Sequence, residues 1–195
     1  MPFIIAPLED VKGLNNYPEY IAALRAVQDA AISRGQQTWG NSQVAGGLIP
    51  RDKQFGVGPF RKNDMAGDTT DSTPSGSYTF RINYTTTGWR DIFRYTVRND
   101  MIHAFAGFLI TDNGLNIMQL RLEIGSRLFP IWDIQEAQRY DKFAIILKTD
   151  QGAELVAEPK TRILLRGYVE ATGIQRVVPL GLQLFRVADS VLTET

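Results

Sequence analysis

The feature that most constrains this chain is an alternation of apolar and polar side chains across residues 77–195. In the stretch LNIMQLRLEI, at residues 115–124, aliphatic side chains alternate with Gln119, Arg121 and Glu123. Successive side chains of a β-strand point to opposite faces of a sheet, so this alternation predicts a strand with one buried face. Similar patterns predict the other strands, at residues 77–84, 89–97, 100–110, 142–149, 161–170 and 174–188.

Short turn sequences separate these predicted strands, among them DNG at residues 112–114 and DQG at residues 150–152. Strands joined by turns, without a helical period between them, are typical of an antiparallel sandwich or barrel. We therefore expect an all-β fold, an antiparallel β-sandwich or jelly roll of about eight strands. Residues 77–195 would form this domain, and residues 1–76 an N-terminal helix followed by a long, glycine-rich extended arm.

One helix is predicted within residues 1–35. Asn16 and Glu19 have the spacing of a capping box, Pro18 suits the first turn, and Gly35 is a natural stop. Apolar side chains recur at spacings of three and four and form a narrow stripe: Ile21, Leu24, Val27 and Ala31. Such a stripe predicts a helix that packs on its own domain or docks on a neighbouring subunit.

Residues 36–76 contain seven of the seventeen glycines and show no sustained period. Disordered segments are poor in aromatic and aliphatic side chains, whereas this segment has one every few positions. The pattern predicts an extended arm that lies over its own sandwich or over a partner, and both alternatives are open. The candidate contact residues of the arm are Trp39, Leu48, Ile49, Phe55 and Phe60.

Arginine outnumbers lysine by fifteen to six, which is typical of surfaces that bind other proteins. Arg90, Arg94 and Arg98 have the same parity in one strand region, and Arg162 and Arg166 share a parity in a later strand. We expect these five arginines to mark interface faces. A solvated sheet face paired with acids, or a site for an anion or glycan, would produce the same pattern.

His103 is the only histidine and lies in the apolar run DMIHAFAGFLI, at residues 100–110. Both faces of a strand with this sequence are apolar, which predicts a central strand covered on both sides. We expect His103 to be a core or interface residue that bonds a backbone carbonyl or a hydroxyl. As a general base it would need a nucleophile and a path for substrate, and the sequence indicates neither.

The remaining residue types offer little chemistry. The absence of cysteine excludes disulfides and thiolate zinc sites, and a single histidine is too few for a histidine-bound metal. The glycine pattern at residues 56–61 lacks the strand–turn–helix context of a phosphate loop. Glu123, Asp133, Glu136 and Asp141 cluster in the sequence, but ordinary surface acids explain them better than a hydrolase site. We therefore expect no enzyme activity, no metal and no cofactor.

The charge balance narrows the set of partners. Lys plus Arg and Asp plus Glu both total 21, and the N-terminal residues carry no basic run. Proteins that package nucleic acid use basic groups to neutralise phosphates, so direct contact with a genome is not expected. No apolar run approaches the roughly 18–20 residues that span a bilayer, and the first residues lack the basic start of a signal peptide. These features alone predict a soluble, cytoplasmic protein.

The layout of helix, arm and antiparallel strands, ending in RILLRGYVEATGIQRVVPLGLQLFRV, resembles single jelly-roll viral capsid proteins. The resemblance implies a structural protein of the virion that forms homo-oligomers and contacts other virion proteins. Because the arm is neutral, it implies a shell or vertex component that meets proteins or an internal membrane rather than the genome.

Two other functions stay open. A β-sandwich module would bind a glycan or another ligand through Trp39, Trp89 or Trp132. A carboxylate hydrolase would lose its activity when Glu123, Asp133 or Glu136 is replaced by its amide.

Overall fold

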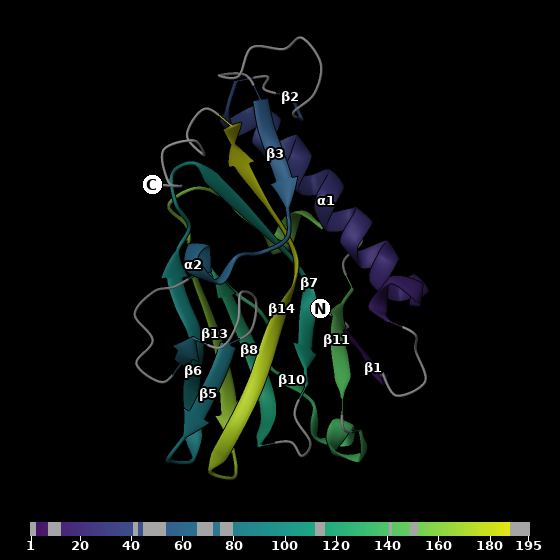
Figure 1. Cartoon of the computed structure of the whole chain (residues 1–195), viewed down its shortest axis with the longest axis vertical. Helices are drawn as coiled ribbons and strands as arrows, with labels where there is room; N and C mark the ends of the chain where they lie inside the picture. Colours follow the sequence, from purple (N-terminus) through teal and green to yellow (C-terminus); the bar gives the residue numbers. More distant parts are fainter. Residues whose placement is uncertain are drawn as a thin grey trace.

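Two β-sheets pack face to face as a sandwich, and one long helix, α1 (Pro18–Thr38), lies against the larger sheet (Figure 1). In the described residues the larger sheet has nine strands and the smaller sheet five. The predicted all-β sandwich is confirmed. The computed structural model describes residues 3–7, 13–40, 43–44, 54–65, 72–74, 80–111, 116–140, 142–148 and 152–187.

Eight strands form the core of both layers in a jelly-roll arrangement. In chain order they pair first with last, second with seventh, third with sixth and fourth with fifth: β5–β14, β6–β13, β7–β11 and β8–β10. Each sheet contains four of them, so the two halves of the chain roll together around one core. Their bounds are β5 (Phe80–Tyr84), β6 (Gly88–Thr96), β7 (Met101–Ile110), β8 (Ile117–Ile124), β10 (Trp132–Asp133), β11 (Phe143–Leu147), β13 (Arg162–Val169) and β14 (Gly173–Arg186).

Shorter strands extend these two layers. β1 (Phe3–Pro7) pairs with β11, β4 (Ser72–Pro74) with β5, β9 (Arg127–Leu128) with β8, and β12 (Val156–Ala157) with β7. β3 (Gln54–Gly58) pairs with β14, and β2 (Gln43–Val44) runs parallel to β3. The short helices are η1 (Leu14–Asn16), α2 (Lys62–Met65), η3 (Gln135–Arg139) and η4 (Ala153–Leu155).

β8 shows how the sequence pattern produces its layer. The aliphatic side chains of this strand are buried in the sandwich, whereas Gln119, Arg121 and Glu123 between them remain partly exposed. The alternation in the sequence therefore corresponds to an inner and an outer face, as predicted.

β7 is central in the larger sheet, as its two apolar faces predicted. It pairs with β11 on one edge and with β14 on the other, and α1 packs on it. Nine of its ten residues are buried. A bulge at Ala106 lets Phe105 and Phe108 both face the smaller sheet, where each contacts Phe93.

The start and end of α1 differ from the prediction. Pro18 is at its N-terminus as expected, but the N-cap residue is Tyr17, not the predicted Asn16, and Tyr17 makes no side-chain cap. Gly35 does not end the helix, which continues to Thr38.

α1 packs on its own domain, which was one of the two predicted alternatives. Its buried stripe consists mostly of small side chains and differs in part from the predicted one: Tyr20, Ala23, Val27, Ala31 and Gly35. Small side chains let the helix axis come close to the sheet. This contact covers the outer face of β7 and β14.

The arm predicted at residues 36–76 contains regular structure that the sequence pattern did not reveal. The last turn of α1, β2, β3, α2 and β4 all lie within it. Its described part pairs with β14 and β5 of the same chain, so it lies over its own sandwich. Within the described ranges, no helix is long and apolar enough to cross a membrane.

Candidate functional site

A hydrogen-bonded pair of side chains, Tyr95 and His103, lies between the two sheets. Tyr95 belongs to β6 of the smaller sheet and His103 to β7 of the larger one, and the Tyr95 hydroxyl is 2.7 Å from His103 Nδ1. His103 is fully buried, and Tyr95 is 4% exposed. The core position and the hydroxyl partner predicted for His103 are both confirmed.

Burial determines the charge state of this pair. Removal from water lowers the pKa of His103 to about 3, so its imidazole is neutral at physiological pH. Burial, and secondly the negative charge of Asp64, raises the pKa of Tyr95 well above 10. Within the part of the chain that the structure describes, His103 Nε2 is buried and has no hydrogen-bond partner. The pair is therefore a neutral contact that leaves one imidazole nitrogen unsatisfied.

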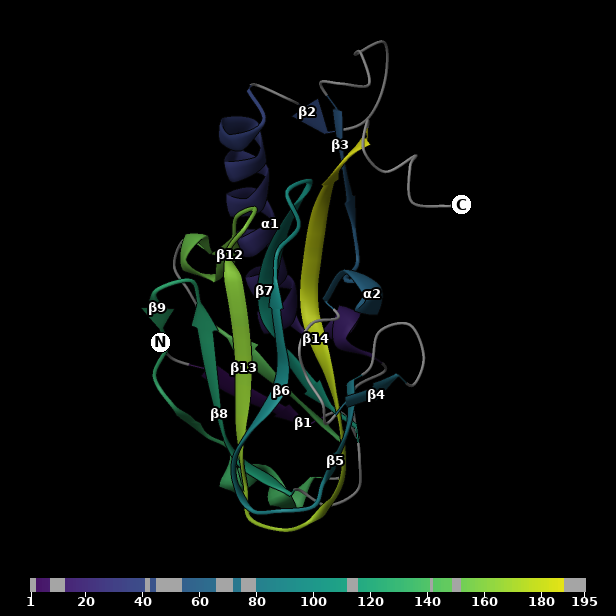
Figure 2. The same ribbon diagram turned by 90° about the vertical axis from the view of Figure 1, so that its left-hand side faces the viewer.

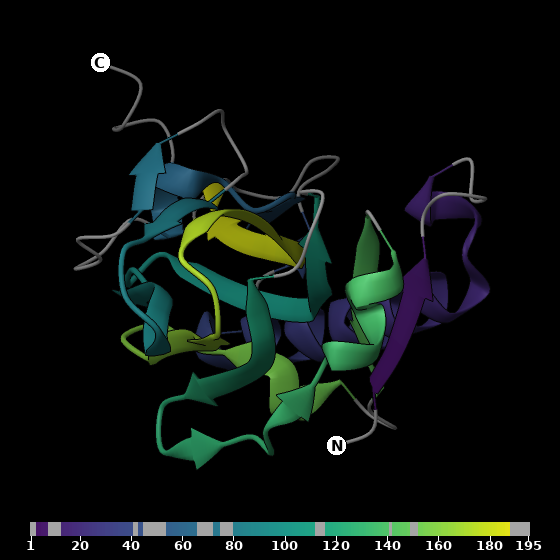
Figure 3. The ribbon, with the colours of Figure 1, turned by 90° about the horizontal axis from the view of Figure 1, so that it is seen from below.

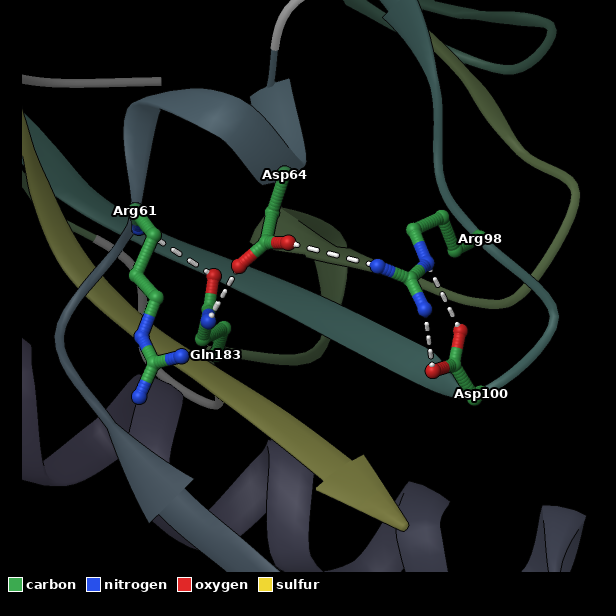
Figure 4. A network of polar contacts seen from close by, with 5 residues as sticks. All are labelled: Arg61, Asp64, Arg98, Asp100 and Gln183. Carbon is green, nitrogen blue, oxygen red and sulfur yellow. Dashed lines mark hydrogen bonds and ion pairs between the residues drawn. The ribbon is translucent and has the colours of Figure 1, made fainter. Parts of the chain in front are cut away.

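Five residues form a polar network beside this pair, where α2 meets β14 and the β6–β7 turn (Figure 4). Gln183 Nε2 donates to Asp64 Oδ2 at 2.8 Å, and Gln183 Oε1 accepts the backbone N–H of Arg61 at 3.3 Å. Asp64 Oδ1 lies 3.6 Å from Arg98, whose guanidinium also bonds Asp100 at 2.8 Å. The network joins the segment that carries α2 to two parts of the sandwich.

Phe60, between β3 and α2, packs directly on the imidazole. Its ring centroid lies 5.4 Å from that of His103 and 5.0 Å from that of Phe105. The segment that carries Phe60 therefore covers His103. Because Tyr95 and His103 are both buried, a substrate does not reach the imidazole in this arrangement, which is suited to holding a segment in place rather than to general base catalysis.

A second cluster lies on the outer face of the smaller sheet, whose strands are in front in Figure 2, with α1 behind them. Asp91 on β6 accepts a hydrogen bond from Arg166 on β13 at 2.8 Å and lies 3.5 Å from Arg94. On β8, Arg121 lies 3.5 Å from Glu123 and directly opposite Arg166 in the register. We call these five residues, Asp91, Arg94, Arg121, Glu123 and Arg166, the arginine cluster.

The predicted common face of Arg90, Arg94 and Arg98 does not form. A register shift leaves Ile92 of β6 without an opposite residue, so Arg90 lies on the other face from Arg94 and bonds the β5–β6 turn. Arg98 lies beyond the end of β6, in the polar network at α2. Arg162 is exposed at the start of β13 and shares a face with Arg166 as predicted, although it lies outside the arginine cluster. The structure thus brings together two of the five predicted interface arginines, those at positions 94 and 166.

Phe55 and Phe60 are core residues of their own chain, which is one of the two predicted alternatives for the arm, so they are not available as contacts for a partner. They are 0% and 4% exposed because they pack into the sandwich of their own chain. Trp39 is half-buried against Phe55, with ring centroids 5.8 Å apart. Leu48 and Ile49 lie outside the described residues.

The predicted acids do not form one site. Glu123 belongs to the arginine cluster, whereas Asp133 and Glu136 line a pocket of about 460 Å³ where η3 lies beside β1 (Figure 3). Asp141 lies outside the described residues. No group of three or more potential metal ligands comes together in the described part of the chain. The pocket is completed by Phe3, Ile5 and Tyr140.

The sequence pattern did not indicate a functional role for Tyr95 of the buried pair, or for Asp64 and Gln183 of the polar network. Gln183 had a usable signal, because it is the polar residue within the apolar run VVPLGLQLF, as His103 is within its own run. The sequence carries no such signal for Asp64. This residue lies in the arm, which has no regular period, so nothing in the sequence indicates that it contacts a distant strand.

No family model matches the chain, and no curated protein matches its sequence. The geometry of the buried pair, the polar network and the arginine cluster is therefore what indicates a function.

Proposed function

We propose that this chain is a structural subunit of the virion or capsid type that self-assembles through the outer face of its smaller sheet, without packaging nucleic acid directly. The observation that carries the proposal is the contrast between the two outer faces. α1 covers the outer face of the larger sheet, whereas the smaller sheet presents the arginine cluster. The Arg94 and Arg166 side chains are 38% and 40% exposed there.

The arginine cluster has the properties of a protein-binding surface. Asp91 holds both Arg94 and Arg166, so their guanidinium groups are ordered before any partner arrives, which lowers the entropy cost of binding. Three arginines face two acids in the cluster, and the excess positive charge favours an acidic surface as the partner. We assign this role to a second copy of the chain, which has as many acids as bases.

The strand pairing supports the proposal by analogy. Viral capsid proteins use this jelly-roll arrangement, and so do lectins and cupins, so the fold alone does not choose between assembly and ligand binding. The arginine cluster is what favours assembly here.

The test is the oligomeric state of the purified chain, measured by light scattering and electron microscopy. We expect oligomers or particles for the unmodified protein and a shift to smaller species for Arg166→Glu. The control is Arg25→Glu, the same charge reversal at an exposed position of α1 on the other side of the molecule. The proposal would be contradicted if the unmodified protein were a monomer at every concentration. It would also be contradicted if Arg166→Glu and Arg25→Glu had the same effect on the oligomeric state.

A second candidate function, a glycan- or ligand-binding module, is favoured by one observation. Trp89 and Tyr168 lie opposite each other on β6 and β13 and form an edge-on pair with centroids 5.7 Å apart. Tyr168 is 36% exposed, whereas Trp132 is buried and Trp39 packs on Phe55. In this case the protein is a monomer whose tryptophan fluorescence changes with an oligosaccharide, and Trp89→Phe removes that change while Trp39→Phe retains it.

A further inference from the structure

We propose that residues 54–65, which carry β3, Phe60 and α2 and which we call the strap, are released from the sandwich by acid through protonation of His103. The strap covers a buried imidazole that has no partner for a second proton. Release occurs within a single subunit, whatever its oligomeric state.

The strap is attached to the sandwich along one edge of β3 and at one end, and among the described residues the other edge of β3 pairs only with the two-residue strand β2. β3 pairs with β14 over four residue pairs, at residues 183–186. At the other end Asp64 bonds Gln183 and lies beside Arg98. Along the strap Phe55, Phe60 and Met65 are 0%, 4% and 1% exposed, so their side chains leave the core when the strap lifts.

The two long strands that carry the pair are held more firmly. β7, which carries His103, is paired with β11 and β12 on one edge and with β14 on the other. β6, which carries Tyr95, pairs with β13 over eight residue pairs. The strap pairs with β14 over four residue pairs, so lifting it costs fewer backbone bonds than displacing β6 or β7.

Neutral side chains surround the imidazole: Tyr95 on β6, Phe60 on the strap, Gln183 on β14 and Ala157 on β12. The charged groups that border this set are bonded to one another at the end of the strap: Asp64, Arg98 and Asp100. A proton on His103 therefore adds a charge among neutral groups, and no described carboxylate contacts the ring to compensate it.

The direction of the pH effect follows from where the proton binds. With the strap closed, His103 takes up a proton only when the pH approaches its lowered pKa of about 3. With the strap open, the imidazole is hydrated and takes up a proton near its ordinary pKa of about 6.5. Between these values the open form binds more protons, so each pH unit below about 6.5 raises the opening constant about tenfold.

The oxidation of methionine by hydrogen peroxide measures this opening on the full chain. Met65 is 1% exposed at the end of the strap, and Met118 is 4% exposed in β8, so the chain contains its own reference. We expect the rate of Met65 oxidation, followed by mass spectrometry, to rise about 30-fold between pH 7.5 and about pH 5. Met118 is exposed only when the sandwich itself unfolds, so it should be oxidised much more slowly than Met65 at every pH. Equal rates at the two methionines, or no acceleration at Met65, would overturn the proposal.

Two variants separate protonation of His103 from general weakening by acid. His103→Gln keeps a polar side chain that does not titrate, so its Met65 rate should no longer depend on pH. Arg98→Gln loosens the end of the strap but leaves His103 in place, so its Met65 rate should be raised at every pH and keep the tenfold dependence. If His103→Gln fails to fold, the unmodified protein and Arg98→Gln still decide the question, because a flat Met65 rate in both excludes release by acid.

Discussion

The Tyr95 hydroxyl and His103 Nδ1, 2.7 Å apart, form a polar contact between the two sheets within a layer of aromatic rings. The ring of Phe93 lies 5.9 Å from that of Tyr95, and the ring of Phe60 lies 5.4 Å from that of His103. A hydrogen bond in such surroundings is electrostatically strong, and an unpaired polar group there is costly. This part of the core is therefore sensitive both to substitution and to pH.

Tyr95→Phe should lower the free energy of unfolding by about 1–3 kcal/mol, because it leaves His103 Nδ1 buried without a partner. Urea denaturation near neutral pH measures the change. The control is Tyr168→Phe, which removes the same hydroxyl from an exposed side chain and should cost less than about 0.5 kcal/mol. Equal effects of the two substitutions would show that the Tyr95–His103 contact contributes nothing of its own.

Stability should fall as the pH falls below about 6.5, because the unfolded chain protonates His103 there while the folded chain does so only near 3. The contribution of neutral His103 to the free energy of unfolding is fully present above about pH 6.5. Below that value it decreases by about 1.4 kcal/mol for each pH unit, or by about 2 kcal/mol at about pH 5. Urea denaturation at a series of pH values tests it. The His103→Gln variant should lack this part of the pH dependence. If its free energy of unfolding changed with pH as steeply as that of the unmodified protein, His103 would not be the group responsible.

Asp64 and Arg98 should be energetically coupled by about 0.5–1 kcal/mol, because Arg98 is 41% exposed while the Asp64 carboxylate is 10% exposed. A double-mutant cycle of Asp64→Asn and Arg98→Gln, measured by urea denaturation, gives this coupling. Raised salt should reduce it, since water reaches the guanidinium. A coupling of zero at low salt would mean that the ion pair does not hold the end of the strap.

Gly107→Ala should destabilise the fold by at least about 2 kcal/mol. A Cβ at this position of β7 would lie 2.1 Å from the backbone carbonyl oxygen of Ile145 on β11, so one strand would have to move. Gly58→Ala on β3 is the matched control, because its Cβ would meet only the edge of the Phe185 ring at 3.6 Å. Thermal unfolding of both variants, followed by circular dichroism, separates a steric clash from a general effect of replacing glycine in a strand.

The sequence predicted the layers of this fold but not their pairing. Alternation identified β8 and β13, and the apolar run around His103 identified a central strand, because burial imposes a period on every strand. The order of the strands depends on contacts between residues that are distant in the sequence, such as Tyr84 opposite Gly173. A local period in the sequence does not indicate such contacts.

The candidate sites were less predictable for two physical reasons. Arg90 and Arg94 are an even number of residues apart, which predicts that they share one face of β6. The bulge at Ile92 reverses the alternation between them, so they lie on opposite faces. β3 escaped notice because two of the five residues in its sequence, QFGVG, are glycine, which is depleted in strands. Gly56 is required there, since a Cβ would lie 2.4 Å from the Phe185 ring, but a single sequence does not reveal that contact.

The place of β14 in the larger sheet bears on how the molecule is made. This strand pairs with β3, β5 and β7, yet it follows all three in the chain. Until the ribosome has added Arg186, those three earlier strands lack their common neighbour, and the nascent chain exposes their edges. The larger sheet is therefore completed only after these three strands have been made, and until then the growing polypeptide is open to mispairing with its own copies.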